Sequence, residues 1–310
     1  MAKVIEVKNL SKKYGPLVAV DGINFSVEKG EIFGLLGENG AGKTTTLEMI
    51  EGLRKPSSGE IKVLGHDSQS EIAEIKNRIG VQLQSSAYFS FLNLREILDL
   101  FGGFYPKRIA TDELLSMVRL REKSKDFVGN LSGGQKQRFS IIASLINDPD
   151  VVFLDEPTTG LDPLARRNLW DIILKIKSQG KTIILTTHYM EEAEKLCDRI
   201  AIMERGKILA IGTVHELILK VNNPFRIQFV AAGIPANIEK NIRGCCGEFV
   251  KFDGKTDHYE LQLKNRKDLK TALSEIEKIN YEDLLVTRAS LEELFIELTG
   301  KAIEDEEANA

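Results

Sequence analysis

The fold of this 310-residue chain is decided by residues 37–44, Gly37-Glu38-Asn39-Gly40-Ala41-Gly42-Lys43-Thr44. The stretch follows the pattern G-x-x-x-x-G-K-[ST], in which glycines let consecutive backbone N–H groups point into one concavity. An apolar, strand-like run (31–36) precedes it, and a helix-compatible run (43–51) follows it. The start of that helix adds the positive end of its dipole to the concavity. The sequence therefore predicts a loop that binds the phosphates of a nucleotide.

The side chains at the end of this loop have separate predicted roles. Lys43 supplies a point charge for the β and γ phosphates, and the Thr44 hydroxyl is placed to ligate Mg²⁺. The other residues of the stretch that we expect to contact the nucleotide are Gly37, Glu38, Asn39, Gly40, Ala41, Gly42 and Thr45. An ordinary Gly-rich turn is the alternative, and the flanking strand and helix argue against it. The loop alone indicates a nucleoside triphosphate but not which reaction follows.

Strand-like and helix-like patterns alternate along the first 220 residues or so. Strands separated by helices imply βαβ crossovers and a mostly parallel sheet. Between about residues 86 and 147 helical patterns replace the strands, which predicts an inserted helical subdomain; within it Thr111 is the expected N-cap of a helix at 112–118. We therefore predict an α/β fold with a mostly parallel sheet core, antiparallel β elements and a helical insertion.

The order of elements changes after Asn222-Asn223-Pro224, the expected linker between a domain at 1–221 and a smaller one at 222–300. The second region reads as strand, helix, strand, strand, helix, strand, which is the split βαβ arrangement of a small α+β domain. Ser290-Leu291-Glu292-Glu293 is a capping box that opens a last helix. The acidic tail (301–310) is expected to be disordered.

Composition excludes several classes of protein. Lys+Arg 42 against Asp+Glu 46 gives a net charge of −4, which argues against a general nucleic-acid binder. The three cysteines make a poor disulfide framework and indicate reduced thiols. The N-terminus has no signal-peptide core, and no apolar stretch approaches the length of a membrane span.

A second chemical motif lies at Val151–Glu156, where an apolar strand ends in two acids. A buried parallel strand delivers its C-terminal residues to the ligand crevice of such a sheet. Asp155 is then placed to hold Mg²⁺, and Glu156 to polarise an attacking water as a general base. Two solvated acids at a strand end are the alternative, and the phosphate loop makes it much the weaker one.

The stretch that distinguishes one kind of ATPase is Leu131-Ser132-Gly133-Gly134-Gln135. Ser132 can cap the following helix, and the two glycines leave N–H groups open to an anion. This pentapeptide is identical to the signature of ABC ATPases, and over about residues 3–220 the chain resembles an ABC transporter ATP-binding subunit. The resemblance implies the P-loop NTPase fold of an ABC cassette, with ATP and Mg²⁺ as ligands and hydrolysis of ATP as the reaction.

The resemblance assigns further residues. Tyr14 matches the aromatic that stacks on adenine, and Gln84 matches the glutamine that touches Mg²⁺ and the attacking water. Asp162 matches the loop after the acid pair, and His188 matches the switch histidine near the γ-phosphate. Their plainer alternatives are a half-buried Tyr, a surface Gln, an N-cap Asp and a structural His.

The resemblance also implies partners. In this family two cassettes pack head to tail, so Ser132, Gly133, Gly134 and Gln135 are expected to serve the ATP of a second ATP-binding subunit. A separate integral membrane permease completes the transporter, which places this chain in the cytoplasm on the inner face of the membrane. We expect the aromatic segment Ser85–Leu94 to form part of the surface that meets the permease.

Residues 290–300 resemble the end of ATP-binding subunits of drug, antibiotic and sodium exporters, which favours export. An importer subunit, or a soluble regulatory or cofactor-assembly ATPase without a permease, are the alternatives. ABC ATPases of DNA repair carry long coiled coils before the signature and ribosome-acting ones carry two cassettes, and this sequence has neither. The transported substrate cannot be read from these motifs.

Overall fold

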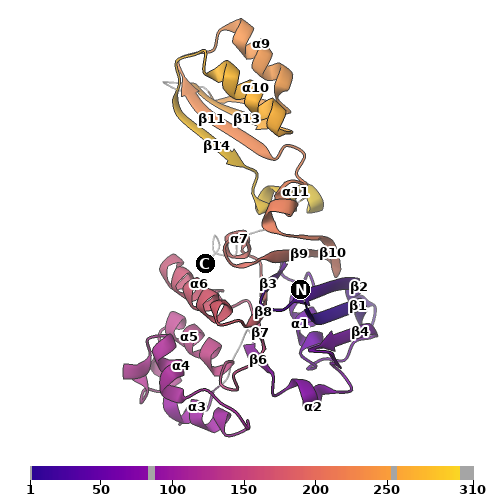
Figure 1. Ribbon diagram of the computed structural model, residues 1–310, viewed down its shortest axis with the longest axis vertical. Coiled ribbons are helices and arrows are strands. Elements are labelled where there is room, and N and C mark those ends of the chain that lie inside the picture. Colours follow the sequence, from indigo (N-terminus) through magenta and orange to yellow (C-terminus); the bar gives the residue numbers. More distant parts are fainter. Residues whose placement is uncertain (1, 83–87, 253–256, 301–310) are drawn as a thin grey trace. The chain divides into compact units, whose positions relative to one another are not determined.

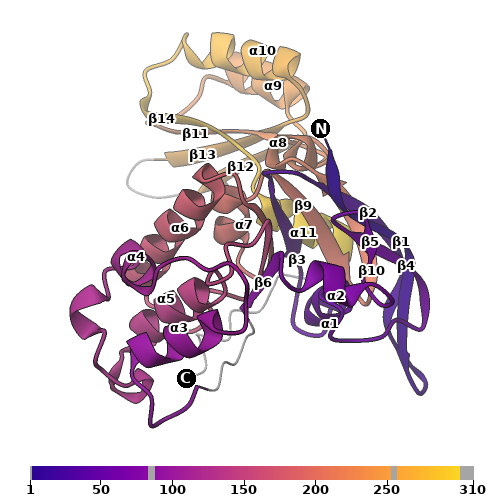
Figure 2. The ribbon, with the colours of Figure 1, turned by 60° about the horizontal axis from the view of Figure 1, so that its bottom comes forward.

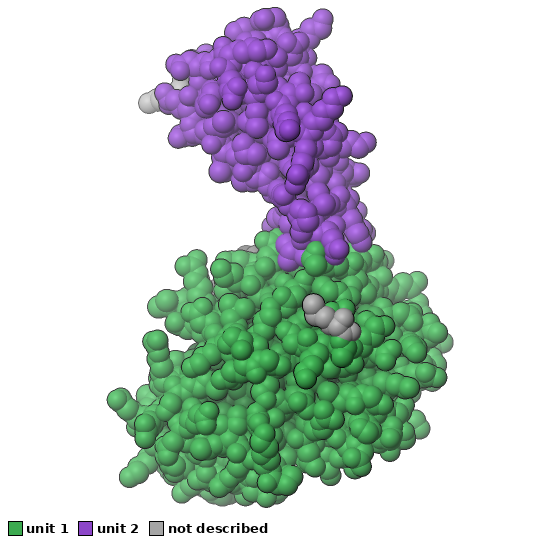
Figure 3. Space-filling view, in the orientation of Figure 1, with its two compact units in different colours: residues 1–213 green, residues 214–310 purple. Residues whose placement is uncertain are grey.

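The computed structural model describes residues 2–82, 88–252 and 257–300. The chain divides into two compact units, Met1–Thr213 and Val214–Ala310 (Figure 3). This division falls before the linker expected at 222–224, because helix α8 (Val214–Ile218) packs against the last helix of the second unit.

A six-stranded sheet forms the core of the first unit, in the order β10-β9-β3-β8-β7-β6 (Figure 1). All neighbouring strands in it are parallel except β9 and β10, which form an antiparallel hairpin. The strands are β3 (Ile32–Leu36), β6 (Ile79–Gln82), β7 (Val151–Asp155), β8 (Thr182–Thr187), β9 (Arg199–Glu204) and β10 (Lys207–Gly212). Every residue of β3, β7 and β8 is buried, as expected for parallel strands covered on both faces.

A second, antiparallel sheet has the order β2-β1-β4-β5. Its strands are β1 (Lys3–Tyr14), β2 (Leu17–Glu28), β4 (Ser58–Val63) and β5 (His66–Asp67). Its apolar side chains, such as Ile5 and Val27, share one hydrophobic core with Phe33 of β3 and Leu47 of α1. Helix α1 (Lys43–Ile50) is thereby held between the two sheets, with the phosphate loop at its start.

Helices make up the predicted insertion and the crossovers. Those of the insertion are α3 (Leu94–Gly102), α4 (Thr111–Met117), α5 (Gly133–Ala143) and the short 3₁₀ turns Arg121–Lys123 and Val128–Asn130. The others in this unit are α2 (Ile72–Ile75), α6 (Pro163–Ser178) and α7 (Met190–Leu196). Helices α3, α4 and α5 gather together, away from the antiparallel sheet (Figure 2). The predicted α/β fold with its helical insertion is confirmed.

One expected cap in the insertion is wrong. Thr111 is the first residue of α4 rather than its N-cap, and Ala110 precedes it without a side-chain cap. The Thr111 hydroxyl instead donates to Asp99 Oδ1 of α3 at 2.6 Å. This bond joins two helices, which a local reading of the sequence does not reveal.

The second unit contains an antiparallel sheet in the order β12-β13-β11-β14. Its elements are β11 (Phe225–Ala231), α9 (Ala236–Cys245), β12 (Glu248–Phe252), β13 (Asp257–Leu263), α10 (Arg266–Ile276), β14 (Glu282–Arg288) and α11 (Leu291–Thr299). Because β13 lies between β11 and β12, this is the predicted split βαβ arrangement. Ile238 and Ile242 of α9 and Ile276 of α10 pack with Ile227 and Leu261 of the sheet.

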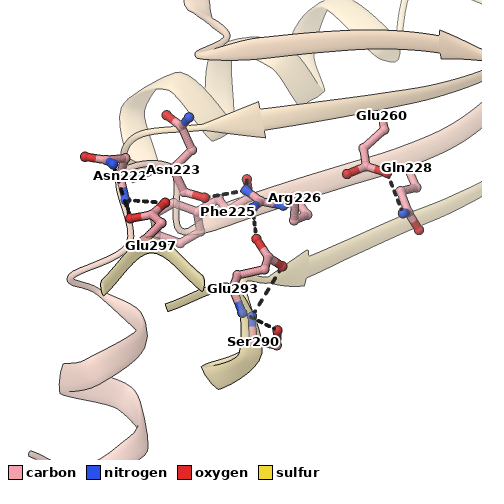
Figure 4. Close-up of polar contacts among 9 residues, drawn as sticks. All are labelled: Asn222, Asn223, Phe225, Arg226, Gln228, Glu260, Ser290, Glu293 and Glu297. Atoms are coloured by element: carbon pink, nitrogen blue, oxygen red, sulfur yellow. Dashed lines mark hydrogen bonds and ion pairs between the residues drawn. The ribbon is translucent and has the colours of Figure 1, made fainter. Parts of the chain in front are cut away.

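Polar contacts connect this sheet to α11 (Figure 4). Arg226, which is buried, forms an ion pair with Glu293, and Glu293 also completes the predicted capping box with Ser290. The backbone N–H of Asn222 donates to Glu297 Oε2 at 3.2 Å. Two carboxylates of α11 therefore hold this helix to the chain at the start of the sheet. The tail at 301–310 lies outside the described residues.

Candidate functional site

The C-terminal ends of three neighbouring parallel strands bring the predicted catalytic residues together (Figure 1). In the register of the sheet, Leu36 of β3 pairs with Thr187 of β8, and Asp155 of β7 pairs with Thr186 of β8. The next residues along the chain are therefore neighbours in space: Gly37, Glu156 and His188. The Gly37 N–H donates to the Thr187 carbonyl at 3.2 Å, which fixes the start of the loop against β8.

Two glycines of the phosphate loop allow backbone approaches that a side chain would block. A Cβ on Gly37 would lie 2.3 Å from the Met203 carbonyl oxygen, and one on Gly42 would lie 2.4 Å from the Ala19 carbonyl oxygen. Gly42 also has a φ of +100°, in the left-handed region, and it precedes the first residue of α1. The loop is thus closely packed against the rest of the chain at Gly37 and Gly42. A Cβ on Gly40 would meet nothing within 4 Å.

Lys43 points back into the loop. Its Nζ donates to the carbonyls of Gly37 at 2.8 Å and Glu38 at 3.1 Å, and it lies 3.2 Å from Glu156 Oε1. Burial lowers the pKa of the Lys43 ammonium, although the Glu156 charge opposes this shift. A buried cation held by carbonyl dipoles and one carboxylate is placed for exchange onto stronger anions such as phosphates.

Glu156 has a strained backbone conformation, and its side chain lies beside Lys43 and His188. Its φ of 45° lies in the left-handed region, and its carboxylate contacts Lys43, the Thr159 hydroxyl at 3.1 Å and His188 Nδ1 at 3.4 Å. The pKa of the Glu156 carboxyl falls to about 2, because His188 and then Lys43 favour the anion more than burial disfavours it. Backbone strain of this kind persists where the surrounding structure fixes it, as it does at functional sites.

Asp155 and Thr44 meet beside this pair. The Thr44 hydroxyl donates to Asp155 Oδ1 at 3.1 Å, and the Thr186 hydroxyl donates to the same oxygen. Burial raises the pKa of the Asp155 carboxyl, against the effect of these hydroxyls. Within the described ranges no group of three or more His, Cys, Asp and Glu side chains gathers in a metal-binding arrangement. One carboxylate and one hydroxyl fit Mg²⁺, which keeps waters and takes phosphate oxygens as its other ligands.

His188 belongs to a stack that the sequence did not predict. The centroids of the His188 and Tyr189 rings lie 4.1 Å apart. The Arg166 guanidinium lies over the Tyr189 ring, 4.1 Å from its centroid. Arg166 comes from the first turns of α6, after the Asp162 N-cap, whose side chain accepts from the Ala165 N–H at 2.9 Å. The start of α6 therefore supports the histidine that touches Glu156.

Tyr14, the predicted adenine-stacking residue, ends β1 and is 38% exposed. Two cations lie over its ring, with Lys12 Nζ at 5.2 Å and Arg54 Cζ at 5.4 Å from the centroid. Both cations are attracted to the π face of the ring, and the stacking of Tyr14 on adenine stays a prediction. Gln84 lies outside the described residues, so its predicted contact with Mg²⁺ and water stays a prediction.

The signature residues form a different group. Ser132 is the N-cap of α5, as the sequence predicts, and it also forms a capping box with Gln135. A pocket of about 280 Å³ is lined by residues of the signature, the loop before α6 and α6 itself: Ser132, Gly133, Gly134, Gln135, Arg138, Gly160, Leu161, Asp162, Ala165 and Asn168. A Cβ on Gly133 would meet nothing within 4 Å, so the N-terminus of α5 is open to a ligand or a second chain.

Comparison with known proteins decides the family. Residues 20–159 match the sequence family described as ABC transporter. The linearmycin resistance ATP-binding protein LnrL of Bacillus subtilis (strain 168) is 38% identical over 97% of this chain and 100% of its own length. The chain belongs to the ABC transporter ATP-binding subunits. The Nod factor export ATP-binding protein I of Burkholderia lata is 36% identical over 97% of this chain and 98% of its own length.

Solved structures agree with this assignment. An ATP-binding subunit of an ABC transporter superposes with a TM-score of 0.64 and 32% identity, over 70% of this chain and 92% of its own. A dimeric ATP-binding cassette in a post-hydrolysis state, bound to ADP and Pi, superposes with a TM-score of 0.62 and 27% identity, over 67% of this chain and 98% of its own. The protein is an ABC ATPase: it binds ATP and hydrolyses it as a subunit of an ABC transporter.

The ABC assignment covers the chain almost from end to end, because the relatives align with 97% of it, and so it includes the second unit. In the described part of the chain no helix combines the length and the hydropathy that crossing a membrane would require.

Proposed function

We propose that the phosphate loop, Lys43 and Thr44 bind the ATP phosphates, and that Asp155 and Thr44 hold Mg²⁺ between them. The hydrogen bonds of Lys43 support phosphate binding. Its ammonium now donates to the carbonyls of Gly37 and Glu38, and phosphate oxygens, which are stronger acceptors, can replace them. The 3.1 Å contact between Thr44 and Asp155 supports the second. Mg²⁺ bound there would neutralise phosphate charge during the reaction.

Glu156 is proposed as the general base. While it pairs with Lys43 its carboxylate is a weak base, with a pKa of about 2. When Lys43 turns to the phosphates, Glu156 loses one of the two side chains that lower its pKa, and its basicity rises. His188 keeps its place beside Glu156 and is proposed to contact the γ-phosphate, and Gln84 is proposed to contact Mg²⁺ and the attacking water. Binding of ATP thereby prepares the base for hydrolysis.

The nucleotide site is proposed to be completed by a second ATP-binding subunit. Each ATP would lie between one chain's phosphate loop, with Tyr14 on the adenine, and the partner's Ser132, Gly133, Gly134, Gln135 and Asp162. The open N-terminus of α5 and the pocket beside it support this arrangement, because oriented N–H groups at a helix start bind anions. ATP would then stabilise the closed dimer, and hydrolysis would release it.

The transport direction is proposed to be export. Relatives aligned over their whole length are named for linearmycin resistance and for Nod factor export, and the end of the chain favours the same direction. A separate integral membrane permease would hold the chain on the cytoplasmic face of the membrane. As domain organisation we propose an ABC cassette followed by a small α+β domain that carries the last helix. An import subunit remains the second candidate.

The proposal is tested by the mass of the purified chain in solution, measured by light scattering with ATP and Mg²⁺, with ADP and Mg²⁺, or with ATP and EDTA. A Glu156→Gln variant prevents turnover during the measurement. We expect a dimer with ATP and a monomer with ADP. A monomer under all three conditions, or a dimer that ignores nucleotide, would contradict the shared site.

A further inference from the structure

A buried carboxyl group lies where helices α6 and α7 pack against each other. Glu192 belongs to the first turn of α7, and its exposed fraction is 0%. Its Oε1 accepts a hydrogen bond from Trp170 Nε1 of α6 at 3.1 Å. Burial raises the pKa of the Glu192 carboxyl. Taking such a group out of water is unfavourable, and an apolar residue of similar size often gives a chain of equal stability. The position of this carboxyl therefore points to a role other than stability.

The hydroxyl groups of two threonines act on the same carboxyl. Those of Thr187 and Thr158 lower the pKa of Glu192, against the effect of burial. The Thr187 oxygen accepts from the Tyr189 N–H at 3.0 Å, which leaves its own proton to donate. Among the described residues, the Thr158 hydroxyl and Glu192 Oε2 have no hydrogen bond of normal geometry, so a small approach of the Thr158 segment would satisfy both.

Each threonine lies close in sequence to a residue of the proposed catalytic machinery. His188 directly follows Thr187, and Glu156 precedes Thr158 by two positions. His188 Nδ1 and Glu156 Oε2 lie 3.4 Å apart. The Thr187 carbonyl also accepts from the Gly37 N–H at 3.2 Å, so the same strand end holds the start of the phosphate loop. One buried carboxyl thus acts on both of the segments that bring the base and the histidine together.

Helix α6 supplies the support for this carboxyl. Trp170 is 4% exposed, so its indole is enclosed by the chain and offers one N–H donor. Arg166 lies one turn earlier on the same face of α6, over the ring of Tyr189, and its charge also lowers the pKa of Glu192. The indole therefore holds one oxygen of Glu192 and leaves the other for the threonine hydroxyls.

We propose that Glu192 is a positioning residue for ATP hydrolysis: held by Trp170, its carboxyl keeps the segments that carry Glu156 and His188 in the relative positions that the reaction requires. The inference rests on the proposed roles of those two residues. Because Glu192 has no exposed surface, it acts through Thr158 and Thr187 and not on the nucleotide. A small misplacement of a base lowers the rate of the chemical step strongly, whereas the phosphate contacts that set ATP affinity remain.

The proposal is tested with Glu192→Leu and Glu192→Gln in the full chain. Leucine fills a similar volume without polar atoms, and glutamine keeps an oxygen for the indole N–H. We expect Glu192→Leu to lower kcat about tenfold or more, with the Kd of ATP within a factor of about three, and Glu192→Gln to restore most of the rate. Glu191→Leu, at the exposed neighbouring position, should change neither. An unchanged kcat in Glu192→Leu, or losses in both variants that follow the melting temperature, would overturn the inference.

A second substitution keeps the test decisive if Glu192→Leu does not fold. Trp170→Phe retains an aromatic ring and removes the N–H that holds Glu192. We expect it to lower kcat about threefold or more with ATP affinity unchanged. Trp170 is the single tryptophan of the chain, so its emission spectrum reports the contact directly. The spectrum should change in Glu192→Leu and not in Glu191→Leu. Unchanged kcat in Trp170→Phe, or an unchanged spectrum in Glu192→Leu, would show that the indole does not hold this carboxyl.

Combined substitutions show whether Glu192 acts through the base. In a Glu156→Gln chain the base is already lost, so adding Glu192→Leu should change the residual single-turnover rate by less than about twofold. Separate losses that multiply would show an independent effect and overturn the proposal. The same preparations separate the inference from the proposed function. If Glu156→Gln loses hydrolysis while Glu192→Leu keeps it, only the inference fails. If Glu156→Gln keeps hydrolysis, the proposed base fails, and the inference fails with it.

Discussion

Lys43 Nζ lies 3.2 Å from Glu156 Oε1, so the predicted phosphate ligand and the predicted base are ion-pair partners. Both side chains are almost fully buried, and each keeps the other's charge satisfied. With the roles proposed above, ATP would compete with Glu156 for Lys43. This competition would couple the arrival of phosphate to the release of the carboxylate that we propose as the base.

The pair should make folding stability depend on Glu156 in a defined pH range. The pKa of its carboxyl is about 2 in the folded chain, below the ordinary value of 4.5, so its contribution is present above pH 4.5 and is lost as the pH falls toward 2. Glu156→Gln should therefore lower the free energy of unfolding at pH 7 by about 1–3 kcal/mol. Denaturant titrations from pH 3 to 7 measure this. Equal stability of both chains at pH 7 would contradict the ion pair.

Substitutions at two glycines separate an effect on the stability of the chain from an effect on the ATP-dependent dimer. Gly42→Ala places a Cβ 2.4 Å from a backbone carbonyl oxygen at a φ of +100°, and should cost about 2 kcal/mol or more of stability and abolish ATP binding. Gly133→Ala meets nothing within 4 Å in its own chain and should not destabilise it. It should still block the ATP-dependent dimer, because the partner's ATP would meet the new methyl group. Thermal melting, nucleotide binding and light scattering separate these outcomes, and a stable dimer of Gly133→Ala would refute the signature contact.

The stack on His188 should matter to turnover and not to binding. Tyr189→Phe keeps the ring between Arg166 and His188, whereas Tyr189→Leu removes it. We expect Tyr189→Leu to lower kcat about tenfold or more with little change in ATP affinity, because His188 loses its position beside Glu156. Tyr189→Phe should restore most of the rate. If kcat fell equally in both variants, or in proportion to a fall in melting temperature, the Tyr189 ring would contribute only to packing and not to the position of His188.

The division of the chain predicts where it can be cut. A fragment ending at Thr213 should fold and bind ATP like the full chain. A fragment ending at Val221 keeps α8 but lacks α11, so Leu217, which is fully buried in the full chain, loses part of its cover. We expect the longer fragment to be the less soluble of the two in sedimentation assays. The reverse order would place the boundary at the Asn222–Pro224 linker instead.

The sequence predicts those parts of the fold that local rules control. The sequence predicts the helix N-caps Ser132, Asp162 and Ser290 correctly, because an N-cap hydrogen bond forms within the first turn of its own helix. The sequence also predicts the order of strands and helices, because the spacing of apolar residues along the chain differs between a half-buried helix and a buried strand. Thr111 was assigned wrongly because its partner, Asp99, is on another helix.

The site shows the same limit. Motif spacing pointed to Lys43, Asp155 and Glu156, since each ends or follows an apolar strand. It gave no sign of the Lys43–Glu156 pair or of Arg166 over Tyr189, which depend on tertiary contacts.

The central claim is that Glu156 activates water in a site where Lys43 binds phosphate, and one measurement tests it most directly. ATP affinity and steady-state ATP hydrolysis are compared, in one set of preparations, for the unmodified chain and Glu156→Gln. The account predicts that the variant binds ATP as tightly as the unmodified chain or more tightly, since Lys43 no longer pairs with a carboxylate, and that hydrolysis falls by about 10²-fold or more. Hydrolysis within a factor of about three of the unmodified rate, with ATP bound, would contradict it.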